Sequence, residues 1–435
     1  MPVFLNTTAD ANFETAFQEL LGAKREASVE VGDAVDAILR DVRADGDDAL
    51  IALTAKFDRL VLTADTLAFS EADIAAEVAK VPSEERAALE LAADRIRAYH
   101  ERQRPTDEWW EDSIGAQLGW RWSSVEAAGL YVPGGLASYP SSVLMNGIAA
   151  QVAGVDRLIM CCPTPDGVVN PLVLLAAELA GVHQVFRVGG AQAIGAMAFG
   201  TASVPKVDVI TGPGNAYVAA AKARVYGSVG IDMIAGPSEI LVIADRDNDP
   251  NWIAIDLLSQ AEHDESAQSI LITDDAGFGQ AVAEAVEARL QTLQRRDIAG
   301  PSWRDFGAVI IVRDMEEAVG LSDRLAPEHL EICTSDAEDL STKIRHAGAI
   351  FIGAWTPEAI GDYVGGPNHV LPTARSARFA SGLSVLDFMK RTTLAKMSPS
   401  ALASIGPAAE TLAKSESLEA HGLSVRARLD RLNEG

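Results

Sequence analysis

Cysteine and aromatic residues are scarce in this chain of 435 residues. Only three cysteines occur, and Cys161 and Cys162 are adjacent while Cys333 is alone, so no Cys-x-x-Cys spacing exists. A zinc site built from thiolates is therefore not expected, and an odd number of cysteines suits the reducing cytoplasm. Aromatic residues make up 6%, but the hydrophobic content of 48% is that of a globular chain with a core.

Basic residues are also few, with 36 Lys and Arg against 62 Asp and Glu, which gives a net charge of −26 at pH 7. This charge would repel the phosphates of nucleic acid and the surface of an anionic membrane. We therefore expect no nucleic acid and no membrane among the partners. The charge does not indicate a substrate.

Long hydrophobic runs are absent, since no apolar stretch reaches the ~18 residues that a membrane helix needs. The first ten residues, MPVFLNTTAD, have no basic region before an apolar stretch. We expect neither a signal peptide nor a membrane span, and a cytoplasmic location.

The chain changes its pattern at Ala127. Residues 12–126 have mostly helical spacing, and the last ~55 residues are polar and helical. Between them, short apolar runs alternate with helical patterns in two series. The predicted strands are 129–133, 157–162, 184–188 and 207–210 in the first series, and 239–244, 269–273, 308–312 and 349–353 in the second. The fold class predicted is α/β, with two Rossmann-like parallel-sheet domains, incomplete and duplicated, plus small helical N- and C-terminal segments.

Three glycine-rich turns follow predicted strands of the first series, at 133–135, 189–195 and 211–215. Ligands of open α/β sheets bind where such loops meet helix N-termini, and a dinucleotide pyrophosphate fits there. Tyr131, Gln192 and Asn215 are placed to contact it. The G-x-G-x-x-G fingerprint is missing, and the alternative is that these glycines only make tight turns.

Polar residues end a predicted helix in the stretch DLLSQAEHD, residues 256–264. Gln260 and His263 are three apart, so on a helix they share one face, and both can bind a cation. The alternative is a helix end that happens to carry polar residues.

Acid–base candidates follow later in the chain. Glu328 and His329 lie in a turn that begins with proline, and both would reach one site only in an irregular segment. Asp362 and His369 lie in a glycine-rich loop, where the backbone can approach a ligand closely. His263, Asp362 and a further histidine would make a catalytic zinc set. His100, His183 and His346 are interpreted as structural or surface residues, and the role of His369 stays open.

Longer stretches resemble the histidinol dehydrogenase family over nearly the whole chain, least over the first ~25 residues. They are GLYVPGGLASYPSSVLMN (129–146), VGGAQAIGAMAFGT (188–201), ITGPGNAYV (210–218), AGPSEILVIAD (235–245), DLLSQAEHD (256–264), APEHLEI (326–332), GDYVGGPNHVLPT (361–373), ARFASGLSVLDFMKR (377–391) and EAHGLSV (419–425).

The resemblance implies an oxidation of L-histidinol to L-histidine through a bound aldehyde, with two NAD used in succession and one zinc ion per subunit. It assigns zinc to Gln260, His263, Asp362 and His421, and proton transfer to Glu328 and His329. It assigns the substrate to Ser238, Gln260, His263, His329, Asp362, Glu416 and His421, and NAD to Tyr131, Gln192 and Asn215.

The resemblance also implies a homodimer, in which Glu416 and His421 reach the active site of the other subunit. Its architecture divides the chain into an N-terminal helical segment (1–24), a discontinuous first α/β domain with the zinc and catalytic residues (25–128 and 239–378), an inserted NAD-binding α/β domain (129–238) and a C-terminal helical segment (379–435). Two alternatives stay open: a related enzyme that oxidises another small alcohol, and a non-catalytic metal- or nucleotide-binding protein.

Overall fold

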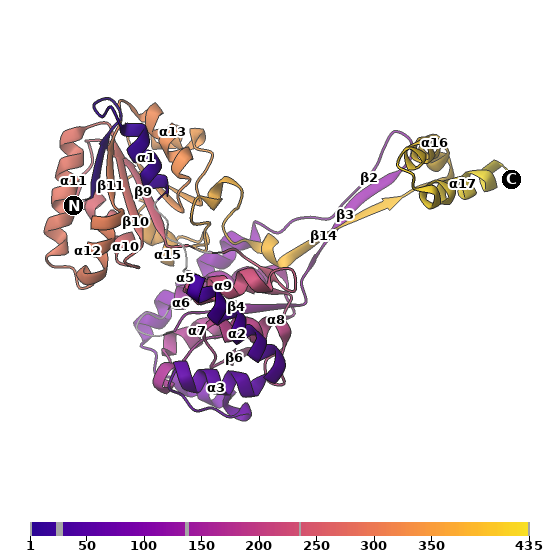
Figure 1. Ribbon diagram of the computed structural model, residues 1–435, viewed down its shortest axis with the longest axis horizontal. Helices are drawn as coiled ribbons and strands as arrows, with labels where there is room; N and C mark the ends of the chain where they lie inside the picture. The colour runs from indigo at the N-terminus through magenta and orange to yellow at the C-terminus, as the bar shows by residue number, and fades with distance from the viewer. Residues whose placement is uncertain (1, 23–28, 135–138, 235, 434–435) are drawn as a thin grey trace. The chain divides into compact units, whose positions relative to one another are not determined.

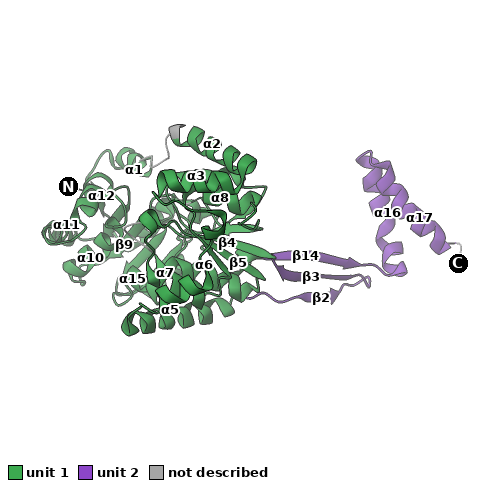
Figure 2. Ribbon diagram, turned by 90° about the horizontal axis from the view of Figure 1, so that it is seen from below, with its two compact units in different colours: residues 1–103, 126–388 green, residues 104–125, 389–435 purple. Residues whose placement is uncertain are grey.

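The computed structural model describes residues 2–22, 29–134, 139–234 and 236–433, and its elements follow one another as drawn in Figure 1. The chain divides into two compact units (Figure 2). The first unit comprises residues 1–103 and 126–388, and the second unit comprises residues 104–125 and 389–435.

A six-stranded parallel sheet forms one half of the first unit, with the strand order β1-β11-β10-β9-β12-β13. Its strands are β1 (Val3–Asn6), β9 (Glu239–Ala244), β10 (Gln268–Thr273), β11 (Ala308–Ile311), β12 (His329–Cys333) and β13 (Ala349–Ile352).

Both faces of this sheet are buried under helices. Alternate residues of β9 point to opposite faces, so Val242 joins one apolar cluster and Leu241 and Ile243 join the other. One face is covered by α10 (Pro250–Ala261), α11 (Ala276–Leu290) and α12 (Arg296–Phe306). The other is covered by α1 (Phe13–Gly22), α13 (Met315–Leu325) and α14 (Ala337–Lys343), and α15 (Glu358–Tyr363) contacts β12 and α10.

A five-stranded parallel sheet forms the other half, with the order β6-β5-β4-β7-β8. The strands are β4 (Ala127–Tyr131), β5 (Arg157–Cys161), β6 (Gln184–Phe186), β7 (Val209–Thr211) and β8 (Gly230–Ile231). One apolar cluster joins this sheet to α2 (Val29–Asp45), α3 (Asp47–Phe57), α8 (Gly190–Phe199) and α9 (Ala216–Val225). A further group of packed helices contains α4 (Glu71–Val78), α5 (Ser83–Glu101), α6 (Pro140–Ala153) and α7 (Pro171–Leu179).

The two sheets share one topology. In the five-stranded sheet, β5 and β6 lie on one side of β4, and β7 and β8 lie on the other. In the six-stranded sheet, β10 and β11 lie on one side of β9, and β12 and β13 lie on the other, with β1 added beyond β11. Each sheet therefore has a topological switch point, between β4 and β7 in one and between β9 and β12 in the other. The expected pair of Rossmann-like parallel sheets is confirmed.

The second unit is built from an antiparallel sheet and a helical hairpin. The sheet has the order β14-β3-β2, and β14 pairs with β3 along its whole length, from Met389↔Ser124 to Lys396↔Gln117. Its elements are β2 (Glu108–Glu111), β3 (Gln117–Ser124), β14 (Met389–Lys396), α16 (Pro399–Ser415) and α17 (Glu419–Asn433). A Cβ at Gly406 would lie 3.1 Å from Val425 and from Leu429, so α16 and α17 pack closely there.

Several expectations about the chain's division need correction. The segment 1–24 is not only helical, because β1 is an edge strand of the six-stranded sheet. Helices α2 and α3 do not pack with that sheet, as the division 25–128 plus 239–378 requires, since their apolar side chains join the cluster of the five-stranded sheet. Residues 108–111, 117–124 and 389–396 are strands where helical pattern was expected. They stabilise each other by pairing across more than 260 positions of chain, which local spacing does not reveal.

No helix in the described parts of the chain is both long enough and apolar enough to cross a membrane.

Candidate active site

Catalytic candidates gather at the amino-terminal edge of the six-stranded sheet. β12 begins at His329 there, and helices that cover a parallel sheet run against the strands, so α10 ends at the same edge with Gln260 in its last turn. Asp362 lies in the last turn of α15, which contacts both β12 and α10. Ligand atoms of His329, Glu358 and Asp362 all lie within 4.8 Å of one another. Residues that are distant in sequence thus form one polar cluster.

His329 is buried, with one ring nitrogen held and the other open. Its Nδ1 lies 3.0 Å from the carbonyl oxygen of Glu239, so Nδ1 carries the proton and donates it. Its Nε2 has no hydrogen-bond partner among the described residues, and lies 3.7 Å from Glu358 Oε1 and 4.0 Å from Asp362 Oδ1. Burial lowers the pKa of His329 to about 4. The imidazole is therefore neutral at pH 7, with an unshared electron pair on Nε2.

Glu328 lies beside His329 although the two are adjacent in sequence. Its Oε2 accepts a hydrogen bond of 3.0 Å from the backbone N–H of Glu239 and lies 3.6 Å from His329 Nδ1. The backbone before it is irregular, with Ala326 in the left-handed region at φ 45°. Burial raises the pKa of Glu328 well above its ordinary value. The expected irregular entry is present, but His329 itself is the first residue of a strand that was not predicted.

Gln260 has the most unusual environment in the cluster. Its side chain is 1% exposed, and neither its amide oxygen nor its amide nitrogen has a hydrogen-bond partner among the described residues. An amide buried in this way costs about 1–3 kcal/mol unless a ligand completes it. A bound metal ion is such a ligand.

His263 and Asp362 complete the part of the predicted zinc set that lies in the first unit. α10 ends at Ala261, so His263 lies just beyond the helix and is exposed, and its backbone N–H donates to the carbonyl oxygen of Gln260 at 3.2 Å. Burial raises the pKa of Asp362, but a hydrogen bond with His369 and favourable electrostatic interactions with the imidazoles of His369, His329 and His263 outweigh it, and the net shift is downward. The charge of His263 also acts on His329, so its imidazole lies near the cluster.

Three further carboxylates near the cluster, two of them buried and one half-buried, were not identified from the sequence. Glu358 is one turn before Asp362 on α15, Asp256 is one turn before Gln260 on α10, and Glu331 is on the same face of β12 as His329. Burial raises the pKa of Glu358 to about 9 and that of Asp256 to about 6. The signal that could have found Glu358 and Asp256 is the four-residue spacing from each predicted ligand.

His369 and Asn368 join the cluster to the helices of the five-stranded sheet. His369 Nδ1 donates to the carbonyl oxygen of Asp362 at 3.1 Å, and its Nε2 therefore accepts from Ser142 Oγ at 3.2 Å. Asn368 Nδ2 donates to the carbonyl oxygen of Met145 at 2.7 Å. The open question about His369 thus has a structural answer: it connects a predicted zinc ligand to α6.

The three predicted NAD contacts lie at the carboxyl-terminal edge of the five-stranded sheet. Tyr131 ends β4 and its hydroxyl accepts from the N–H of Gly190 at 3.1 Å, while Gln192 is buried in the first turn of α8. Asn215 caps α9, accepting from Tyr217 N at 3.1 Å and Val218 N at 3.2 Å. They surround the switch point between β4 and β7, where α/β sheets of this kind bind ligands.

Of the remaining predicted contacts, Ser238 lies in the first unit, and Glu416 and His421 lie in the second. Ser238 directly precedes β9, at the same edge of the six-stranded sheet as His329, and its carbonyl oxygen accepts from Gln268 N at 3.0 Å. Glu416 directly follows α16 and His421 lies in α17, so both belong to the second unit, and both are exposed. The predicted substrate set is thus divided between the two units, and so is the zinc set.

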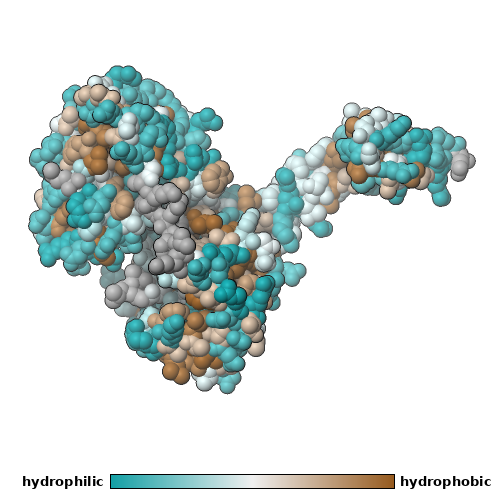
Figure 3. Space-filling view, viewed as in Figure 1, coloured by the Kyte–Doolittle hydropathy of each residue, from teal (hydrophilic) through white to brown (hydrophobic). Residues whose placement is uncertain are grey.

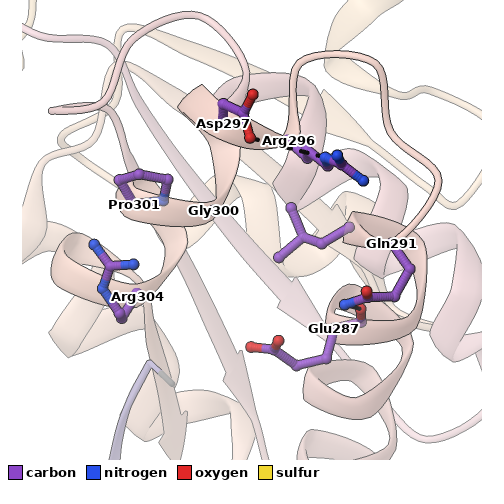
Figure 4. Close-up of a pocket in the computed structure, with 8 residues that line it drawn as sticks. Glu287, Gln291, Arg296, Asp297, Gly300, Pro301 and Arg304 are labelled. Carbon is purple, nitrogen blue, oxygen red and sulfur yellow. Dashed lines mark hydrogen bonds and ion pairs between the residues drawn. The ribbon is translucent and has the colours of Figure 1, made fainter.

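A surface hollow between α11 and α12 contains none of these residues (Figure 4). Arg296 in its lining is paired with the neighbouring Asp297 at 3.8 Å. The lining residues are Glu287, Leu290, Gln291, Arg296, Asp297, Gly300, Pro301 and Arg304. The hollow carries no candidate acid, base or ligand set.

Comparisons with known proteins agree on one family. The family model described as histidinol dehydrogenase matches residues 22–429. The histidinol dehydrogenase of Cereibacter sphaeroides is 71% identical over 435 residues, covering 100% of both chains, and that of Ruegeria pomeroyi is 71% identical over 433 residues, again covering 100% of both. The crystal structure of histidinol dehydrogenase from Elizabethkingia anophelis superposes with a TM-score of 0.94 at 37% identity, covering 99% of each chain. The chain therefore belongs to the histidinol dehydrogenase family.

Proposed function

We propose that this protein oxidises L-histidinol to L-histidine in two successive steps through bound L-histidinal, using zinc and two NAD, as the last steps of histidine biosynthesis. The observation that carries the proposal is the buried His329, whose open Nε2 lies 3.7 Å from Glu358 Oε1 and 4.0 Å from Asp362 Oδ1. Family membership supports the substrate.

Zinc fits the donors that are present. Gln260 and Asp362 offer oxygen and His263 offers nitrogen, which are atoms that zinc accepts, and a catalytic zinc site keeps room for substrate. We infer that these three residues hold the ion together with His421. When bound, zinc would hold the imidazole and amine of the substrate in place.

His329 is the proposed base of both oxidations. Its hydrogen bond to Glu239 keeps the proton on Nδ1, so Nε2 can accept the proton of the substrate hydroxyl. The pKa lowered to about 4 leaves His329 unprotonated at the start of each step. NAD, when bound, would accept the hydride from the substrate carbon atom that bears this hydroxyl.

Glu328 is the proposed base for the water that adds to the aldehyde. Its Oε2 is fixed by the backbone N–H of Glu239 at 3.0 Å, beside His329. Because burial raises its pKa, Glu328 must lose a proton before it can act, and the hydration step should become faster as pH rises. Ser238 is the proposed further substrate contact in the first unit.

NAD is proposed to bind at Tyr131, Gln192 and Asn215. Gly212 supports this placement, because a Cβ there would lie 2.0 Å from the carbonyl oxygen of Tyr131, so the backbone loops after β4 and β7 approach each other closely. Glycine at that position, with φ 118°, lets the two loops meet at the switch point, where we infer that the dinucleotide binds.

A homodimer is part of the proposal, with Glu416 and His421 supplied to the other subunit. The hairpin of α16 and α17 exposes Leu412 and Leu423, and hydrophobic residues interrupt its hydrophilic surface (Figure 3). Exposed leucines on a two-helix hairpin favour a protein partner. We also infer a cytoplasmic location, since the three cysteines are buried free thiols.

The test supplies purified, zinc-loaded protein with L-histidinol and NAD and measures NADH and histidine. Two NADH per histidine are expected. Turnover of another alcohol with none of histidinol would overturn the substrate assignment, and turnover that survives complete removal of metal would overturn the zinc assignment.

A further inference from the structure

Asp58 is a buried carboxylate with one unpartnered oxygen, just after the end of α3. Its side chain is 8% exposed, and its Oδ2 has no hydrogen-bond partner among the described residues. It lies beyond the last residue of α3, with its backbone N–H bonded to the carbonyl oxygen of Thr54 at 2.9 Å. The carbonyl groups at the end of a helix disfavour a negative charge, and burial disfavours it further.

The neighbouring Arg59 does not form an ion pair with Asp58. Its guanidinium group is taken by Asp166, with Nε 2.7 Å from Asp166 Oδ1. Burial raises the pKa of Asp58, and the charge of Arg59 only partly opposes this. A carboxylate kept at a cost in this position is expected where a ligand supplies the missing donors.

The position of Asp58 is at the carboxyl-terminal edge of the five-stranded sheet. Its carbonyl oxygen accepts from Asp166 N at 2.8 Å, in the segment that follows β5. Its charge contributes to the raised pKa of the Tyr131 hydroxyl and of the Cys162 thiol, so the carboxylate lies near the ends of β4 and β5. Asp58 therefore lies near the proposed NAD loops.

The loops after β4, β5 and β6 converge on Pro163. A Cβ at Gly134 would lie 2.2 Å from the carbonyl oxygen of Pro163, and one at Gly189 would lie 2.4 Å from its Cβ. Thr164, the next residue, is 1% exposed, and its hydroxyl has no partner among the described residues. Two unpartnered polar groups, Asp58 and Thr164, thus lie where backbone loops meet closely.

Dinucleotide-binding sheets usually carry an acidic residue about 20 residues after their glycine-rich loop, and it binds the hydroxyls of the adenosine ribose. In this sheet β5 is the second strand of the series, and it is followed by Cys162, Pro163 and Thr164, none of which is acidic. The next acid, Asp166, is exposed and already paired with Arg59. We propose that Asp58, supplied by α3, accepts the hydrogen bonds of the adenosine ribose diol and selects NAD against NADP. The inference rests on the proposed use of NAD, and it adds a residue and a specificity to that site.

The charge of Asp58 accounts for the selectivity. A carboxylate accepts two hydroxyl protons well, but it repels the phosphate that NADP carries on the 2′ oxygen. Loss of a hydrogen bond to a charged group weakens binding roughly ten- to a hundred-fold.

The experiment compares Asp58→Asn and Asp58→Glu with the wild type, and uses Asp65→Asn, an exposed acid in the same half of the unit, as the control. Direct binding of NAD is measured by calorimetry, and steady-state kinetics are measured with NAD and with NADP. Asp58→Asn should weaken NAD binding roughly ten-fold or more and increase kcat/KM with NADP, while the KM for histidinol stays near that of the wild type. Asp58→Glu should weaken NAD binding without increasing kcat/KM with NADP, because glutamate keeps the negative charge but places it one methylene farther from the backbone. Asp65→Asn should change neither NAD binding nor kcat/KM with NADP.

Thermal unfolding checks that the variants are folded. Asp58→Asn should unfold at the same or a higher temperature, since it removes an unpaired buried charge. Wild-type protein that does not bind NAD would contradict the proposed function. Wild type and Asp58→Asn that bind NAD equally would overturn only the role of Asp58. If Asp58→Asn does not fold, unchanged NAD binding by a folded Asp58→Glu overturns it instead.

Discussion

At the scale of single residues, the site depends on which atoms are satisfied and which are left open. His329 Nδ1 is bonded to a backbone carbonyl while Nε2 is open, and Gln260 has no partner at either end of its amide. The first pattern is typical of a base with a fixed tautomer, and the second is typical of a side chain that binds a metal ion or another ligand. The two residues should therefore respond differently to substitution.

His329→Asn should lower kcat by about 10²–10⁴ and leave zinc content near that of the wild type. The asparagine amide can still donate to the Glu239 carbonyl, so the local structure is kept while the base is lost. Stopped-flow or steady-state kinetics measure the first effect, and metal analysis of the purified variant measures the second. Loss of zinc would show that His329 is a ligand and not a base.

Gln260→Leu should stabilise the metal-free protein by about 1–3 kcal/mol, because it removes a buried amide that has no partner. The same change should abolish most of the stabilisation that added zinc produces in the wild type. Denaturant unfolding with and without zinc measures both. A metal-free variant that is less stable than the wild type would indicate that the amide has a structural partner.

At the scale of elements, a chain of buried hydrogen bonds joins α5 to the segment that follows α15. His100 Nδ1 donates to Gln103 Oε1 at 2.6 Å, and its Nε2 accepts from Asn368 Nδ2 at 3.1 Å. Asn368 precedes His369, which contacts both Asp362 and Ser142. Of the two roles expected for His100, structural or surface, the structural one holds, because the side chain is buried in this chain of hydrogen bonds.

Acid should weaken this connection. Burial lowers the pKa of His100, although the hydrogen bond to Gln103 opposes this. The unfolded chain therefore binds a proton at a higher pH than the folded chain does, and stability falls as pH drops below about 6.5, by up to about 1.4 kcal/mol per pH unit. Urea unfolding at pH 7.5 and 5.5 measures the loss of stability for metal-free wild type and for metal-free His100→Gln. Subtracting the loss in the variant from the loss in the wild type removes the contribution of the other histidines. An equal loss of stability in both proteins would show that His100 does not contribute.

At the scale of the whole molecule, the predicted zinc set is divided between two compact units. Gln260, His263 and Asp362 belong to the first unit, and His421 belongs to the second, on a helix with no buried residue. A hairpin of this kind is expected to pack against another surface. The proposed homodimer would provide this surface for the hairpin and would complete the set of zinc ligands in trans.

Mixing His421→Ala with His263→Ala should restore activity that neither variant has alone. If the site is shared, one of the two sites of each mixed dimer combines the unchanged His263 of one chain with the unchanged His421 of the other. That site has its full set of ligands. Subunit exchange is verified first with differently tagged chains, and activity is then measured across a range of mixing ratios. No recovery in verified mixed dimers would contradict the trans arrangement.

The amino-acid sequence by itself determined the alternation of strands and helices, the position of the loops after β4 and β7, and the family. Hydrophobic periodicity is a local property, so β9 and β10 could be predicted where they occur. The long matching stretches identified the family because they combine many positions at once.

Only the tertiary structure decided which of these residues meet. Pairing of β3 with β14, the buried carboxylate of Glu358 and the unpartnered Asp58 all depend on chain segments that are far apart in sequence. Sheet hydrogen bonds and burial arise from such contacts. Local spacing can single out a residue such as Glu358, but it does not show which distant residues that side chain meets. The site at the amino-terminal edge of the six-stranded sheet is therefore a property of the fold, while its residue types are a property of the sequence.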